Sequence, residues 1–155
     1  AVVSAGLTPE QCGLLLNWRV GPAGQTPGTR NFVSVQQAGG MRARLPLSPV
    51  HLKAMEQDDG SVAISWIRRG RIDADAWLAE EIPLGEESEK YRIELAGEEG
   101  EVRRVAEVAT PSWTYPEELA LADFPDRPCQ VEVTVRQVSS SVGAGVPARC
   151  RVTLT

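Results

Sequence analysis

The stretch Asp59-Gly60-Ser61-Val62-Ala63-Ile64-Ser65-Trp66 decides the fold of this chain. Beyond the turn residues, its apolar side chains recur at every second position: Val62, Ile64 and Trp66. The segment before the turn, residues 49–55, alternates in the same way through Val50, Leu52 and Ala54. Alternation on both sides of an Asp-Asp-Gly turn is typical of a β-hairpin with one buried face. Because Trp66 lies on that face, we expect it at the centre of a hydrophobic core.

Two more pairs of alternating segments follow along the chain. In the first pair, residues 91–95 lead into a Gly-Glu-Glu-Gly turn, and the returning segment 101–108 is out of phase around Arg103-Arg104. That irregularity predicts a β-bulge or a change of partner strand. The second pair encloses the loop 139–145, and its apolar positions are Val131, Val133, Val135, Cys150, Val152 and Leu154. One apolar and one polar face on each strand is the pattern of two packed sheets.

Residues 48–155 therefore hold six or seven strands, which indicates an all-β fold, an antiparallel immunoglobulin-like β-sandwich. We expect Trp66, Tyr91 and Val133 in its structural core. Helical periodicity is scarce, so we expect negligible helix beyond a turn after Thr8.

Residues 1–47 differ from the rest in composition. Leu14 to Val20 indicates a buried strand, although Thr8-Pro9-Glu10-Gln11 resembles a capping box and could open a short helix instead. Residues 21–46 are rich in Gly and Pro, with one short strand candidate at Phe32 to Val35. We interpret residues 1–47 as the trailing edge of a preceding domain plus an extended connector arm. Residue 1 is then an internal point of a longer polypeptide.

Charge and hydropathy restrict the function classes. The chain has 155 residues, 16 basic and 21 acidic, and its net charge of -5 does not favour a nucleic-acid partner. Eleven acids lie between Asp73 and Glu101 against Lys90 and Arg92, which is typical of a solvated face. The longest aliphatic run, Leu14 to Leu16, is far shorter than a membrane span, so no membrane segment is expected.

No constellation of residues indicates catalysis. The motifs of serine hydrolases, zinc proteases and nucleotide-binding loops are all missing, and His51 is the only histidine. Three cysteines without a CxxC pair exclude a zinc site and favour free thiols. Paired carboxylates such as Asp73 and Asp75 lie in connections, without the defined separation that acid and base catalysis needs. We therefore expect no enzyme activity, no metal and no cofactor.

The connection after Trp66 joins three arginines to a tryptophan: Arg68, Arg69, Arg71 and Trp77. Arginine and tryptophan are enriched where proteins dock, so these residues are candidates for partner contact. In the alternative, Trp77 covers one end of the sandwich and the arginines pair with nearby acids. The residues themselves leave both readings open.

Two family resemblances follow from longer strings. The segments 59–66, 91–95 and 131–137 resemble a fibronectin type III domain, in which the tryptophan and Tyr91 occupy core positions of the second and third strands. Where many members have a tyrosine at the start of the sixth strand, this chain has Val131, so a tyrosine corner is in doubt.

The second resemblance spans almost the whole chain. It rests on the strings 18–23 (Trp-Arg-Val-Gly-Pro-Ala), 47–52 (Leu-Ser-Pro-Val-His-Leu), 65–73 and 83–87. These resemble the C-terminal part of the tail hub, or host-specificity, proteins of long-tailed phages and of gene transfer agents. In that family a glycoside-hydrolase-like barrel lies upstream, and none of its catalytic residues can be assigned here.

The tail-hub resemblance implies a structural and interaction module in the tail tip of a virion or virus-like particle. It also implies partners: other tail-tip proteins, further copies of the chain in a symmetric hub, and a host surface receptor. The alternative is an accessory β-sandwich of a secreted carbohydrate-active enzyme or adhesin. Such modules expose aromatic platforms for sugars, for which only Trp77 and Trp113 are candidates.

Overall fold

The computed structural model describes residues 6–26, 28–40, 42–70 and 84–155. The chain divides into two compact units, Ala1–Arg44 and Leu45–Thr155. The division falls three residues before the boundary that the composition suggests, because residues 45–49 belong with the second unit. There the amide of Val146 donates to the carbonyl of Pro46 at 3.1 Å, and Ser48 Oγ donates to the carbonyl of Pro147 at 2.9 Å.

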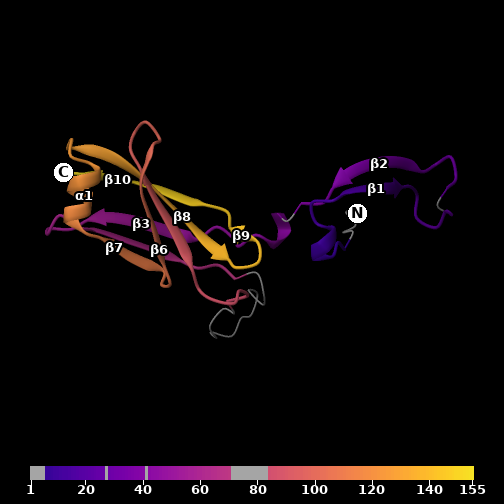
Figure 1. Cartoon of the computed structure of the whole chain (residues 1–155), viewed down its shortest axis with the longest axis horizontal. Helices are drawn as coiled ribbons and strands as arrows, with labels where there is room; N and C mark the ends of the chain where they lie inside the picture. The colour runs from indigo at the N-terminus through magenta and orange to yellow at the C-terminus, as the bar shows by residue number, and fades with distance from the viewer. Residues whose placement is uncertain (1–5, 27, 41, 71–83) are drawn as a thin grey trace. The chain divides into compact units, whose positions relative to one another are not determined.

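The second unit is an antiparallel β-sandwich (Figure 1), as the alternation predicts. One sheet has the order β3-β4-β7, formed by Val50–Glu56, Val62–Ile67 and Ser112–Tyr115. The other sheet has the order β10-β8-β5-β6, formed by Ala148–Leu154, Cys129–Ser139, Tyr91–Ala96 and Val102–Val108. A short strand β9, Gly143–Ala144, pairs with the end of β8.

The core lies between the two sheets and is built from the inward-facing residues of the predicted strands. Trp66 is 4% exposed, and Tyr91 and Val133 are fully buried. The rings of Trp66 and Tyr91 meet edge to face, with centroids 5.0 Å apart and an interplanar angle of 72°. This geometry places the positive edge of one ring against the negative face of the other. The two aromatic residues thereby join the two sheets.

Two edge strands are irregular. On β6 the register shifts between Leu95 and Ala96, whose partners are Arg104 and Val102, so the bulge predicted around Arg103-Arg104 is confirmed. On β3 the register shifts between Val50 and Lys53, and His51 lies in the left-handed region with a φ of 52°. The sequence gives no sign of this second bulge, because His51 keeps the alternation intact. Bulges of this kind discourage edge-to-edge pairing with other chains.

The expectation of negligible helix is wrong at α1, Glu117–Asp123, in the connection between β7 and β8. Its residues Glu-Glu-Leu-Ala-Leu-Ala-Asp are mostly good helix formers, two acids occupy the first turn, and Pro116 precedes them. Ala120 is fully buried and Phe124, just beyond the helix, is 4% exposed. A helix of two turns is too short to show a clear helical period in the sequence.

The first unit contains an antiparallel pair of strands, β1 (Leu15–Val20) and β2 (Val33–Ala38), and two 3-10 turns, η1 (Pro9–Gln11) and η2 (Arg42–Arg44). The residues after Thr8 thus form one turn, and the following segment is a strand. The expectation that this strand is buried is wrong, since Leu15 is 66% and Val20 61% exposed. Within the described part of this unit, the two-stranded sheet has no second layer to cover it.

Candidate functional site

The predicted contact residues are only partly within the described structure. The side chain of Arg68 is 14% exposed, and its Nε lies 3.9 Å from Glu89 Oε1. The same carboxylate oxygen accepts a hydrogen bond of 2.6 Å from the hydroxyl of Tyr91. Arg68 therefore covers the end of the core, whereas Arg69 is exposed. Arg71 and Trp77 lie outside the described residues.

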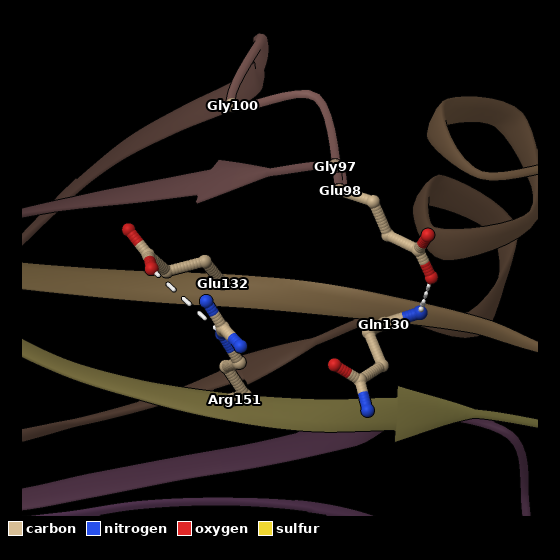
Figure 2. A pocket seen from close by; sticks show the side chains of 6 residues that line it. All are labelled: Gly97, Glu98, Gly100, Gln130, Glu132 and Arg151. Atoms are coloured by element: carbon tan, nitrogen blue, oxygen red, sulfur yellow. Dashed lines mark hydrogen bonds and ion pairs between the residues drawn. The ribbon is translucent and has the colours of Figure 1, made fainter.

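A second site, which the sequence analysis did not identify, lies where the β5–β6 turn meets β8 and β10. It is a cavity of about 300 Å³ (Figure 2), lined by Gly97, Glu98, Gly100, Gln130, Glu132 and Arg151. The turn is closed by two backbone hydrogen bonds, from Gly97 to Glu101 at 3.1 Å and from Gly100 to Gly97 at 2.9 Å. Gly100 has a φ of 81°, which explains why a glycine ends the Gly-Glu-Glu-Gly string.

We call residues 97–101 the acidic turn, because Glu98, Glu99 and Glu101 are all exposed there. Only Glu98 is attached to the neighbouring strand, where its Oε1 accepts a hydrogen bond of 3.3 Å from the backbone amide of Gln130. Neither Glu99 nor Glu101 has a side-chain hydrogen bond or ion pair to any residue that the structure describes.

We call Arg149 and Arg151 the arginine pair. They occupy two successive outward-facing positions of β10. Both lie close to the carboxylate of Glu132 on β8: Arg149 Nε is 3.6 Å from Glu132 Oε1, and Arg151 Nε is 4.0 Å from Glu132 Oε2. Their side chains are 57% and 71% exposed. Exposed ion pairs at such distances contribute little stability, and one carboxylate neutralises only one of the two charges. The arginine pair thus keeps donors free for another anion.

The outer face of the β10-β8-β5-β6 sheet is basic as a whole. Three acids face five bases across it: Glu94, Glu107 and Glu132 against Lys90, Arg92, Arg136, Arg149 and Arg151. The register places Arg92 directly opposite Arg136, a pairing of like charges that is unfavourable in a sheet. Ion pairs join Lys90 to Glu107 at 2.7 Å and Arg92 to Glu94 at 3.0 Å. A basic sheet face therefore borders the acidic turn, although the chain is acidic overall.

The acidic turn is supported from behind by α1. Arg103 Nη1 donates to the carbonyl of Asp123 at 2.8 Å, and its guanidinium lies over the ring of Phe124, 5.5 Å from the centroid. Cation–π contact and hydrogen bond together fix the base of the turn. A second cavity of about 210 Å³ lies on this side of the turn, between Phe124 and Cys129.

Asp123 joins the outer strands of both sheets to the helix. Its carboxylate accepts bonds from Arg104 Nε at 2.6 Å, from Arg104 Nη2 at 2.7 Å and from the hydroxyl of Tyr115 at 2.6 Å. The Tyr115 hydroxyl also lies 3.0 Å from the carbonyl of Leu119. The connection between β7 and β8 is thus anchored by a tyrosine at the end of β7, while Val131 at the start of β8 is a buried core residue.

The environment of this network shifts the pKa values of its members. Burial raises the pKa of the Asp123 carboxyl, but hydrogen bonds from Arg104 and Tyr115 lower it by more, so its net pKa lies below the usual value. The pKa of Tyr115 is raised by burial and by its bond to Asp123. Asp123 is therefore held ionised and Tyr115 neutral at physiological pH.

The remaining chemical features of the described residues are their possible metal ligands and their cysteines. No group of three or more His, Cys, Asp or Glu among them could hold a metal ion. Cys129 lies opposite Leu154 and Cys150 opposite Val133, out of register for a disulfide as the strand pattern predicts. Burial raises the pKa of the Cys150 thiol, which keeps it protonated and unreactive. No helix in the described ranges has the length and apolar character to cross a bilayer.

Comparison with solved structures places the fold. Domains d3–d4 of the rat CD45 extracellular region match with a TM-score of 0.52 at 10% identity, over 98% of this chain and 70% of that one. The FN5 domain of Drosophila Lar matches with a TM-score of 0.41 at 16% identity, over 70% of this chain and 96% of that one. The sandwich is fibronectin type III-like.

A bacterial structure also resembles the chain. The spore cortex lytic enzyme SleM of Clostridium perfringens matches with a TM-score of 0.47 at 7% identity, over 88% of this chain and 38% of that one. No protein-family model and no curated protein matches the sequence. At 10% identity, the likeness to the CD45 domains concerns the fold alone.

Proposed function

We propose that this chain is a non-enzymatic structural and interaction module in the distal tail of a phage or gene transfer agent particle. The observation that carries the proposal is the exposed, charged outer face of a fibronectin type III-like sandwich. The proposed location rests on the segments of the sequence that resemble tail-hub proteins. They fall in both units, at β1 and its following turn and at the start of β3.

The proposed partners are other tail-tip proteins, further copies of the chain and a host surface receptor. The outer sheet face presents arginines, which bind carboxylates through two parallel hydrogen bonds. Arg69 adds an exposed base at the other contact region, at the start of the connection after Trp66. A sugar platform has less support, because Trp113 is packed against Tyr115, with ring centroids 5.4 Å apart, and is only partly exposed.

Antibodies raised against residues 48–155 should decorate the tail tip of purified particles. The expected result in electron microscopy is labelling at one end of the tail, because a hub module lies there in every particle. Labelling of the capsid or the tail shaft, or recovery of the protein only in the soluble lysate, would contradict the location. Pre-incubation of the antibody with the purified chain is the matched control and should remove the label.

The purified chain should also release no product from peptidoglycan or from a panel of glycans. The expectation follows from the sequence, in which no pair of titratable groups stands in a recognisable acid and base relation. Reducing-sugar release is the measurement. Turnover that disappears on Asp73→Asn or Glu80→Gln would overturn the assignment as a non-enzymatic module.

A further inference from the structure

The basic sheet face carries more positive charge than its own acids neutralise. Each of its three glutamates is already engaged: Glu107 by Lys90, Glu94 by Arg92, and Glu132 by both members of the arginine pair. Five bases face three acids there, so two positive charges remain without a carboxylate. The surface is therefore able to bind further anionic groups.

The centre of this surplus charge is Arg136 on β8. Its side chain makes no hydrogen bond or ion pair with any residue that the structure describes. The register places Arg92 directly opposite Arg136, and Arg149 one row further along, opposite Thr134. Like charges directly opposite each other destabilise a sheet. A pairing that costs stability, and that the described chain does not offset, is typical of a functional surface.

The positive charges that lack a full partner lie in three successive rows of the sheet. Arg136 lies in the first row, Arg149 in the second, and Arg151 in the third, opposite Glu132. Outward positions two residues apart on an antiparallel strand are separated by about 7 Å. An extended segment lying along the strands has the same repeat, so acidic side chains at every second position match the three rows.

We propose that the basic sheet face binds an extended acidic segment of a partner protein, whose carboxylates at alternate positions pair with Arg136, Arg149 and Arg151. The planar guanidinium of arginine suits this role because it binds a carboxylate through two parallel hydrogen bonds. The side chains of Arg149 and Arg151 are 57% and 71% exposed, so a partner reaches them without any movement of the strands.

The remaining side chains of this face favour a protein partner over a sugar polymer or a nucleic acid. All four strands lie within the described ranges, and their aromatic side chain, Tyr91, is in the core, so a sugar ring finds no stacking platform outside. Val102 and Val105 are each 47% exposed on the same face, and apolar side chains beside arginines are common in protein interfaces. The net charge of -5 repels a nucleic acid.

This inference rests on the proposed function for its choice of a protein as partner, and the two can fail separately. A chain that binds the acidic probe described below, but whose antibody does not label the tail tip, would overturn the location alone. A chain that is labelled at the tail tip, but does not bind the probe, would overturn the binding face alone.

The test is fluorescence anisotropy of a labelled peptide mixed with the full chain. The probe carries four glutamates at alternate positions, separated by serines, and the control peptide has the same composition with the four glutamates in one block. We expect the alternating peptide to bind more tightly, because more of its carboxylates face the sheet at once. Binding should be lost between about 0.1 M salt, where the Debye length is about 10 Å, and about 1 M salt, where it is about 3 Å.

Two charge-reversal variants locate the binding. Both Arg136→Glu and Arg149→Glu/Arg151→Glu should weaken binding of the alternating peptide at least about tenfold. The control Arg19→Glu/Lys53→Glu makes the same change in net charge as the double variant, at exposed residues of β1 and β3, and should bind like the wild type. Circular dichroism verifies that every variant folds.

The stability of Arg136→Glu is an independent measurement. The substitution replaces a pair of like charges with an ion pair to Arg92, so the melting temperature of the chain should rise while binding falls. Removal of an arginine that supports the fold would have the opposite effect. A lower melting temperature would therefore overturn the view of Arg136 as a charge that the chain leaves without a partner.

Four binding results would overturn the proposal. These are no binding of the alternating peptide at about 0.1 M salt, equal binding of the alternating and block peptides, variants that bind as the wild type does, and equal binding at about 1 M salt. Retention of the chain on immobilised heparin, without peptide binding and lost in Arg149→Glu/Arg151→Glu, would assign the face to a sulfated polysaccharide instead.

Discussion

Replacing Trp66 by alanine should lower the free energy of unfolding by about 3–5 kcal/mol. The indole is 4% exposed and packs edge to face on Tyr91 across the sandwich. Truncation removes the largest side chain of β4 and leaves a cavity that the two sheets cannot close without moving together. Domains of this size are stable by about 5–15 kcal/mol, so the loss is a large share of the total. Urea denaturation followed by circular dichroism measures it.

Two further variants serve as controls for the size of this stability loss. Trp113→Ala truncates the same side chain on the neighbouring strand of the same sheet, opposite Ile64, where the ring is only partly buried. It should cost clearly less than Trp66→Ala. Trp66→Phe keeps an aromatic ring against Tyr91 and should also cost less. Equal losses for Trp66→Ala and Trp113→Ala would show that Trp66 is not the centre of the core.

The sandwich could be predicted because its signal is local. Alternation with a period of two reveals a strand with one buried face, and it held for β4, β5, β8 and β10, so that Trp66 and Tyr91 could be assigned to the core from their positions alone. The bulge at Arg103 was visible for the same reason, since an extra residue shifts the alternation by one position.

The features that escaped prediction depend on which segments meet in space. The cavity beside the acidic turn brings Glu98 and Arg151 together from positions more than fifty residues apart, and only the strand order places them side by side. The strand register places Arg151 opposite Glu132, but the alternation of apolar residues does not determine the register. The prediction that β1 is buried was also wrong, because the residues of one strand do not tell whether a second layer covers them.

Replacing Asp123 by alanine should lower the free energy of unfolding by about 2–4 kcal/mol. The substitution removes the acceptor for two bonds from Arg104 and one from Tyr115, and leaves the buried Tyr115 hydroxyl beside the carbonyl of Leu119. The side chain of Asp123 is 12% exposed, so water replaces these bonds poorly. Asp126→Ala is the matched control: that carboxylate is exposed three residues away and its removal should change stability by less than about 0.5 kcal/mol.

The contribution of Asp123 should depend on pH in a defined direction. Its pKa in the folded chain lies below the usual value, which is about 3.9 in an unfolded chain. The stabilisation is therefore fully present above about pH 4–5, and it is lost as the pH falls through the lower pKa of the folded state. Asp123→Asn keeps the shape of the side chain but not its charge. The difference in unfolding free energy between the wild type and Asp123→Asn should be constant from pH 7 to about pH 5 and shrink below about pH 4, as the wild-type carboxyl becomes neutral. A difference that stayed constant down to pH 2, or grew on acidification, would mean that the ionised carboxylate of Asp123 does not hold α1 against β6 and β7.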